Sequence, residues 1–123
     1  VANCGHNPAL LWTRDFGMCQ FLSTSGTALG LFAGPTFERS IREEVVKFQP
    51  QDRILFYTDG VVEAMDPRAQ EFTEKQLLKL VNANAGKSSQ ELVQGLVSAL
   101  DRHRAAAEQN DDITILSLAR QPG

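Results

Sequence analysis

The run Arg53-Ile54-Leu55-Phe56-Tyr57-Thr58 constrains the fold of this chain more than any other segment. It is almost continuously apolar and rich in β-branched and aromatic residues, which is typical of a central strand that is covered on both faces. The turn-forming residues Gln49-Pro50-Gln51-Asp52 come before it, and Asp59-Gly60 follows it directly. The pattern therefore predicts a sheet built around residues 53–58, with a carboxylate where its central strand ends.

The residues before this strand predict more strands and turns. Gly5-His6-Asn7-Pro8 is a cluster of turn formers, and the apolar run Ala9–Trp12 follows it. Asp15-Phe16-Gly17 is expected to turn the chain again before Cys19–Leu22. Residues 37–48 alternate in polarity on both faces, which predicts a long, partly exposed strand.

Two helices are predicted after residue 72. Thr73 and Gln76 have the spacing of a capping box, and Phe72 with Leu77 has the spacing of a hydrophobic staple. This helix is expected to end near Gly86, because glycine is the preferred residue just beyond a helix C-terminus.

The second helix begins with a capping box of its own, formed by Ser88 and Glu91. Five apolar residues then recur at helical spacing and predict a stripe that packs onto a sheet: Leu92, Val93, Leu96, Val97 and Leu100. Residues 113–118 close the chain as a buried strand. Together the elements predict an α+β fold, in which helices cover at least part of an antiparallel sheet.

Composition narrows the class of protein. The 123 residues fit one domain, and a net charge of −3 favours neither nucleic acid nor an anionic membrane as a partner. No apolar run approaches the roughly 20 residues of a membrane span, and no signal peptide is evident at the N-terminus. Cys4 and Cys19 belong to no paired-cysteine motif, so we expect two free thiols and a cytoplasmic protein.

Two acidic spots could carry chemistry. Asp59-Gly60 ends the best strand, and Asn110-Asp111-Asp112 opens the last one. If these strands are antiparallel neighbours, Asp59 and Asp111 meet at one edge of the sheet. Gly60 would allow the backbone to turn sharply and approach a ligand closely. Converging carboxylates need a cation, and oxygen ligands suit Mg²⁺ or Mn²⁺.

The pattern also fits a structural role for these residues. Asp-Gly at a strand end is a common turn, and Asp-Asp before a strand is a common solvated cap. His6 is either a structural residue bonded to nearby backbone or a general acid, with the structural role favoured. His103, between Arg102 and Arg104 near a helix end, is expected to be solvated.

Four motifs, in the order in which they occur, resemble those of the metal-dependent protein phosphatase (PPM, or type 2C) superfamily, and most of all its bacterial branch that includes SpoIIE and RsbU. They are Asn3-Cys4-Gly5-His6-Asn7-Pro8-Ala9-Leu10-Leu11, Leu29-Gly30-Leu31, Pro50-Gln51-Asp52-Arg53-Ile54-Leu55-Phe56-Tyr57-Thr58-Asp59-Gly60-Val61-Val62-Glu63-Ala64 and Asn110-Asp111-Asp112-Ile113-Thr114-Ile115-Leu116. The most specific is the stretch Tyr57-Thr58-Asp59-Gly60. The resemblance spans essentially the whole chain.

The resemblance implies an α-β-β-α sandwich of two antiparallel sheets with flanking helices and a site for two Mn²⁺ or Mg²⁺ ions at one sheet edge. In this family a metal-bridging water attacks phosphoserine or phosphothreonine directly. By motif match Asp59 and Asp111 would be metal ligands that position this water, and Gly60 would be the close-approach glycine of the metal site. Asp112 would either contact the metal ligands without binding the metal itself, or cap the start of the last strand.

One family motif, an upstream aspartate-glycine pair, is expected before Asn3. Residues 1–123 are therefore expected to form the C-terminal portion of a single SpoIIE/RsbU-like domain, inactive alone because the N-terminal portion of the fold is absent. Unpaired strand edges in such a portion predict a homodimer or strand exchange.

Three function classes follow. The first is a phosphoprotein phosphatase, whose substrate in this family is a phosphorylated STAS-domain anti-sigma-factor antagonist. The second is a non-catalytic module that binds such partners. An aspartate-glycine motif upstream in the parent gene would favour the enzyme over this module. The third is a purely structural domain without metal dependence.

Overall fold

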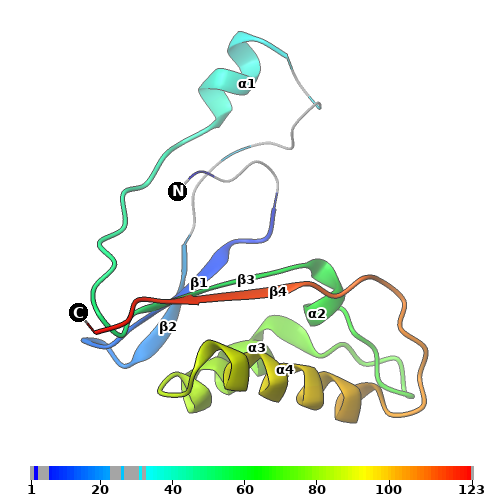
Figure 1. Ribbon diagram of the computed structural model, residues 1–123. Coiled ribbons are helices and arrows are strands. Elements are labelled where there is room, and N and C mark those ends of the chain that lie inside the picture. The colour runs from blue at the N-terminus through cyan, green and yellow to red at the C-terminus, as the bar shows by residue number, and fades with distance from the viewer. Residues whose placement is uncertain (1, 3–5, 23–25, 27–30, 32, 123) are drawn as a thin grey trace.

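The computed structural model describes residues 2, 6–22, 26, 31 and 33–122. Along these residues the strands and helices follow one another as β1 (Ala9–Thr13), β2 (Met18–Leu22), α1 (Pro35–Ser40), β3 (Arg53–Tyr57), α2 (Asp59–Val62), α3 (Thr73–Asn84), α4 (Ser89–Arg104) and β4 (Ile115–Ala119). Figure 1 shows α3 and α4 beneath the sheet, α2 at one end of it, and α1 far from it.

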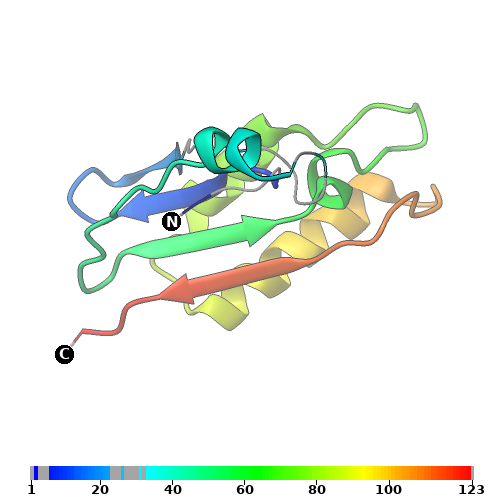
Figure 2. The ribbon, with the colours of Figure 1, turned by 90° about the horizontal axis from the view of Figure 1, so that it is seen from above.

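The described strands form one antiparallel sheet in the order β2-β1-β3-β4 (Figure 2). The predicted central strand is confirmed, because β3 pairs with β1 on one side and with β4 on the other. The predicted turns at 15–17 and 49–52 are also present, the latter with a hydrogen bond from the Asp52 N–H to the Gln49 carbonyl (3.0 Å).

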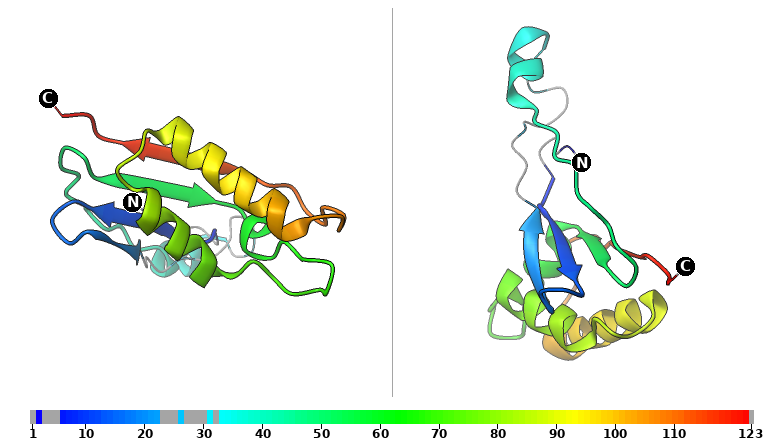
Figure 3. Two further views of the ribbon diagram at one scale, coloured as in Figure 1. Left: turned by 90° about the horizontal axis from the view of Figure 1, so that it is seen from below. Right: turned by 90° about the vertical axis from the view of Figure 1, so that its left-hand side faces the viewer.

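One face of the sheet packs on α3 and α4 (Figure 3). Leu10, Leu55 and Tyr57 project from the strands into this core and are at most 2% exposed. They meet helix residues that are equally buried, namely Leu77, Val81, Leu92 and Leu96. Each such side chain stabilises the fold by about 1.5–3 kcal/mol relative to an exposed one, so the helices hold β3 firmly in place.

The other face of the sheet is only partly covered, and this corrects two predictions. Ile54 and Phe56 of β3 are half-buried there, packed beside Val46 and Phe48, rather than fully covered on both faces as predicted. The last strand begins at Ile115 and is an edge strand instead of a buried one. Its alternate residues Leu116 and Leu118 are 51% and 49% exposed.

The prediction of a strand over 37–48 is wrong. Its first residues form α1, which begins with Pro35 and carries Glu38 in its first turn and Arg39 in its last. Proline presets the backbone angle of a first helical turn, and these charges suit the helix dipole. Residues 41–49 then run without regular pairing, except for a bridge between Glu43 and Ala2. Alternating polarity over 37–48 was therefore a weaker signal than the helix start at Pro35.

The two predicted helix caps differ in outcome. In α4 the box is complete, because the Glu91 N–H donates to Ser88 Oγ (3.1 Å) and the Ser88 N–H donates to the Glu91 carboxylate (3.0 Å). In α3 only the Gln76 N–H reaches Thr73 Oγ1, at 3.5 Å, and Thr73 has a φ of 73°. That left-handed backbone departs from the extended conformation of a good cap. The staple residues Phe72 and Leu77 are both in the core.

The predicted stripe of α4 is confirmed with one exchange. Leu92, Leu96 and Leu100 are buried against the sheet, and Ala99 joins them. Val93 is half-buried and Val97 is 43% exposed, so the two valines of the stripe are only partly covered.

Two charged residues at the start of β3 are buried and hydrogen-bonded. The Asp52 carboxylate accepts the N–H groups of Arg14 (3.0 Å) and Gln49 (2.9 Å). Arg53 donates to the carbonyls of Lys87 and Ser88, between α3 and α4. Burial lowers the pKa of Arg53, and these carbonyls are the compensation that a buried guanidinium needs. This end of β3 is thus tied to both helices, opposite the end that carries Asp59.

Of the two predicted free thiols, Cys19 is free and half-buried against α3, where burial raises its pKa to about 11. Its backbone N–H donates to Asn82 Oδ1 (2.7 Å). Cys4 lies outside the described residues.

Removing the complete helix cap is expected to destabilise the protein. The substitution Ser88→Ala should lower the free energy of unfolding by about 1 kcal/mol, because one backbone N–H of α4 loses its acceptor. Urea denaturation followed by circular dichroism measures this loss. The matched control is Ser98→Ala, an exposed serine inside the same helix. It should be neutral or slightly stabilising, and an equal loss in both variants would contradict the role of the cap.

Candidate functional site

Thr58 joins the ends of the two strands that carry the predicted site. Its N–H donates to the Thr114 carbonyl (3.1 Å), and its hydroxyl donates to the Asp112 carbonyl (3.2 Å) while accepting the Thr114 N–H (3.0 Å). These bonds extend the β3–β4 pairing beyond Tyr57. Thr58 was predicted only as a strand and motif residue, without these contacts; a hydroxyl directly before the strand-end aspartate was the available signal.

The predicted meeting of Asp59 and Asp111 at one sheet edge is confirmed. β3 and β4 are antiparallel neighbours, with Tyr57 opposite Ile115, so the end of β3 lies beside the start of β4. Both aspartates line one open cavity of about 250 Å³. The remaining residues of its lining are His6, Asn7, Thr58 and Asp112. Two carboxylates from distant parts of the sequence thus line one open hollow.

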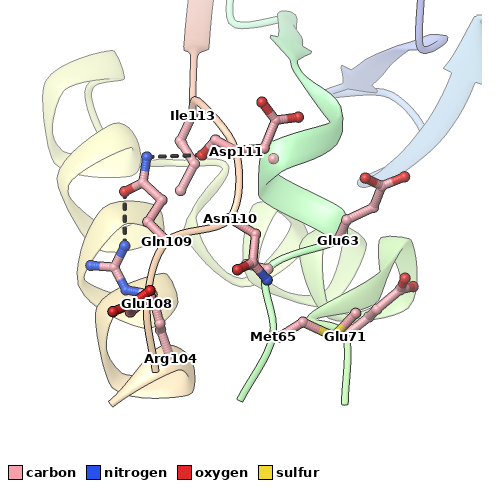
Figure 4. Close-up of a pocket in the computed structure, with 11 residues that line it drawn as sticks. Glu63, Met65, Glu71, Arg104, Glu108, Gln109, Asn110, Asp111 and Ile113 are labelled. Carbon is pink, nitrogen blue, oxygen red and sulfur yellow. Dashed lines mark hydrogen bonds between the residues drawn. The ribbon is translucent and has the colours of Figure 1, made fainter. Parts of the chain in front are cut away.

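Asp111 is held by hydrogen bonds from both sides of its loop. Its Oδ1 accepts the N–H of Asp112 (2.7 Å), and its carbonyl accepts Gln109 Nε2 (2.9 Å). Figure 4 shows the second bond continuing to Arg104, whose guanidinium donates to Gln109 Oε1 (2.8 Å). Arg104 also pairs with Asp101 (3.1 Å), so the loop is anchored to the end of α4. This chain of contacts had no recognisable sequence pattern.

Asp112 acts here through its backbone. Its N–H holds the Asp111 carboxylate, and its carbonyl receives the hydroxyl of Thr58. Its side chain lines the same cavity as both other aspartates. The contacts therefore agree with a residue that supports Asp111 and leave its role toward a metal as a prediction.

Gly60 packs against the chain itself. It lies in α2 and is buried, and a Cβ atom built on it would stand 2.2 Å from the Asp112 carbonyl oxygen. Its φ is not in the left-handed region, so the glycine serves close packing of two backbones rather than a sharp turn. The expected close approach exists, but to Asp112 instead of to a ligand. A role of Gly60 in metal binding stays a prediction.

A side chain at position 60 should separate α2 from the loop that begins β4. We expect Gly60→Ala to lower the free energy of unfolding by about 1–3 kcal/mol, since neither backbone can yield cheaply. Thermal and urea unfolding measure the effect. Gly95→Ala is the matched control, because no atom lies within 4 Å of a Cβ at that position in α4. The control should be stabilised, by up to about 1 kcal/mol; a stable Gly60→Ala protein would contradict the close contact.

His6 and His103 have different outcomes. His6 Nδ1 lies 3.2 Å from the Asn7 carbonyl, as expected for a structural ring, yet the residue also lines the cavity of the two aspartates. The prediction that His103 is solvated is wrong. Its Nε2 lies 3.1 Å from the Ala64 carbonyl and 3.0 Å from the Gln70 carbonyl, and its ring packs edge-on against Phe72. Both carbonyls are acceptors, so a hydrogen on Nε2 would be shared between them, and these contacts tie the loop after α2 to α4.

Tyr57 places a hydroxyl deep beside the site. It is 2% exposed, and its hydroxyl has no hydrogen-bond partner among the described residues. Burial, together with the charges of Glu74 and Asp59, raises the pKa of Tyr57 from 10.0 to about 12. All three effects disfavour the negatively charged tyrosinate.

The raised pKa predicts a loss of stability at high pH. Below pH 10 the hydroxyl is protonated in both states, but between pH 10 and about 12 only the unfolded chain ionises, so stability falls as pH rises. Tyr57 is the only tyrosine, so tyrosinate absorbance reports it alone. The folded protein should titrate near 12 and the urea-unfolded protein near 10. Tyr57→Phe should remove this part of the loss of stability at high pH. A folded protein whose tyrosine titrates near pH 10 would contradict the prediction.

The donor set fits part of a divalent metal site. Asp59, Asp111 and Asp112 offer only carboxylate oxygens, the donors that Mg²⁺ and Mn²⁺ favour. Over residues 6–22 and 33–122, no group of three or more histidine, cysteine, aspartate or glutamate side chains is arranged to hold a metal ion. The chemistry of the ligands is therefore suitable, and their number within the described residues is small.

Comparison with known proteins shows which family the chain belongs to. The model of the stage II sporulation protein E (SpoIIE) family matches residues 1–121. The chain belongs to this family. Its relatives include the protein IcfG of Synechocystis sp., which is 28% identical over 118 residues, or 96% of the chain and 18% of IcfG.

Solved structures share the fold. The SiaA-PP2C domain of Pseudomonas aeruginosa has a TM-score of 0.74 at 22% identity over 94% of the chain, and the Mn-presoaked SpoIIE phosphatase domain of Bacillus subtilis has 0.70 at 13% over 99%. The RsbU and RsbW domains of a Mycobacterium tuberculosis protein have 0.63 at 30% over 98%. The chain covers 44%, 50% and 31% of these three structures.

The family match shows what the chain belongs to, and the solved structures show that it shares the α+β fold of the PP2C phosphatase domains of SiaA and SpoIIE. The predicted resemblance is confirmed. PP2C-type phosphatases are metal-dependent, which suits the carboxylates at the edge of β3 and β4. Of the motif residues, Asn3, Cys4, Gly5, Leu29 and Gly30 lie outside the described part. Within that part, no helix has the length and apolar character to cross a membrane.

Proposed function

We propose that this chain contributes to a metal-dependent phosphatase that hydrolyses phosphoserine or phosphothreonine in a protein. The observation that carries the proposal is the meeting of Asp59 and Asp111 in one open cavity at the edge of β3 and β4. Membership of the SpoIIE family supports it, and so does the fold that the chain shares with the SpoIIE phosphatase domain of Bacillus subtilis. The substrate that fits this family is a phosphorylated STAS-domain anti-sigma-factor antagonist.

In this proposal each residue of the site has a defined task. Asp59 and Asp111 hold Mn²⁺ or Mg²⁺, and Gly60 contributes its backbone beside Asp59. A bound ion supplies Lewis acidity, which activates water and offsets phosphate charge. The Asp112 N–H holds Oδ1 of Asp111, which leaves the other carboxylate oxygen for the metal. Thr58 keeps the two ligand-bearing strand ends in register.

We also propose that residues 1–123 act as the C-terminal portion of a single phosphatase domain. The chain spans 44% of the SiaA-PP2C domain and 50% of the Mn-presoaked SpoIIE phosphatase domain. Since the described residues offer few metal ligands, residues beyond them would have to complete the site.

The proposal predicts metal-dependent hydrolysis that depends on both aspartates. With Mn²⁺ and a small aryl phosphate, a protein extended upstream by about 100 residues, to the usual size of a domain, should be active. The 123-residue chain should be inactive. Asp59→Asn and Asp111→Asn should each reduce kcat/KM at least about 100-fold, since even outer partners of metal ligands cost 10–100-fold.

The matched control is Asp15→Asn, which removes the same charge from the turn between β1 and β2. That turn lies at the far end of the sheet, because Trp12 pairs with Arg53 at the start of β3. The control should keep full activity. An extended protein that is folded but inactive with Mn²⁺ would sink the enzyme proposal and favour the non-catalytic partner-binding module.

A further inference from the structure

A second cavity adjoins the proposed metal site and shares Asp111 with it (Figure 4). One wall comes from α2 and the loop behind it, with Glu63, Met65 and Glu71. The facing wall comes from the end of α4 and the loop before β4, which carries Gln109. Its volume is about 280 Å³. A substrate whose phosphate lies at Asp111 would bring its neighbouring residues to this hollow.

The size and the lining of the cavity suit one extended side chain. Pockets for drug-sized ligands measure roughly 300–1,000 Å³, so this one is at the lower limit. Ala64, Met65 and Ile113 are half-buried and give it an apolar surface. An aliphatic stem can lie on such a surface while its polar end stays at the rim in water.

The charge of the residues that line the cavity determines which kind of side chain can bind there. Glu63, Glu71, Glu108 and Asp111 bring four carboxylates against the single guanidinium of Arg104, a net formal charge of −3. Arg104 is already engaged by Asp101 and Gln109. An anionic side chain would therefore be repelled, and a cationic one attracted.

Glu63 and Glu71 are the central members of this acidic rim. Both also line the neighbouring cavity that contains Asp59, so they stand between the surroundings of the two aspartates. Neither side chain forms a hydrogen bond or ion pair within residues 6–22 and 33–122. They are also not part of any group of three or more residues there that could hold a metal ion. For these two carboxylates, a cationic side chain is therefore a better partner than a metal ion.

We propose that this cavity is a specificity subsite that binds a lysine or arginine side chain close to the phosphorylated residue of the protein substrate. The stem of that side chain lies on Ala64, Met65 and Ile113, and its charge is met by Glu63 and Glu71. The proposal rests on the proposed phosphatase function, which determines where the phosphorylated residue lies.

The test compares phosphopeptides in which one lysine is moved through the positions that flank the phosphoserine, with glutamine and glutamate at the same positions as references. The bridging oxygen of the phosphoserine is replaced by a methylene group so that no turnover occurs, and binding to the complete protein with Mn²⁺ present is measured by fluorescence anisotropy. At one or two positions lysine should lower the Kd about three- to tenfold relative to glutamine, in the range of a few exposed charge contacts. The preference should shrink in high salt.

The double variant Glu63→Gln/Glu71→Gln should bring the lysine-to-glutamine ratio of Kd values close to one. Glu38→Gln, on the distant helix α1, is the charge-matched control and should keep the full ratio. Equal binding of lysine and glutamine peptides by the unaltered protein, a preference for glutamate, or an unchanged ratio in the double variant would each overturn the proposal. If the protein prefers lysine peptides but does not hydrolyse the aryl phosphate, the result would instead count against the phosphatase function.

Discussion

The pairing of β3 with β4 is the interaction on which the rest of the structure depends. Its register places Tyr57 opposite Ile115, and Thr58 extends it by three hydrogen bonds to Asp112 and Thr114. Two carboxylates that are 52 positions apart in the sequence, Asp59 and Asp111, reach one cavity only because this register holds. A slip by one residue would turn alternate side chains to the other face of the sheet and separate the two strand ends.

The helices make this register durable. Leu55 and Tyr57 are buried against α3 and α4, and Arg53 ties the start of β3 to the connection between these helices. At the other end of β3, Gly60 lets α2 approach the Asp112 carbonyl more closely than any side chain would allow. The core thus holds one end of the strand, and backbone contact holds the end that carries the site.

Negative charge collects at that end at little cost, because the carboxylates are exposed to water. Asp59 and Asp111 face one cavity, while Glu63 and Glu71 line the neighbouring ones. Such an edge suits the two kinds of cation that we propose, a divalent metal between the aspartates and a basic side chain beyond them. The Arg104–Gln109 contact fixes the loop between these regions, so metal binding and substrate recognition would share Asp111 as their common wall.

The sequence alone determined the central strand, the turns beside it, both long helices and the family, because hydrophobic periodicity, caps and motif residues are local signals. It predicted the meeting of Asp59 with Asp111 only on the condition that their two strands pair, and the tertiary structure met that condition. Only the tertiary structure decided the outcome elsewhere. Residues 37–48 alternate like a strand but find no partner strand, so the start signal at Pro35 prevailed. The solvent exposure of Leu116 and the contacts of His103 depend on what packs beside them. Gly60 shows the same limit, since a glycine in sequence does not tell which backbone comes close; that follows from long-range packing alone.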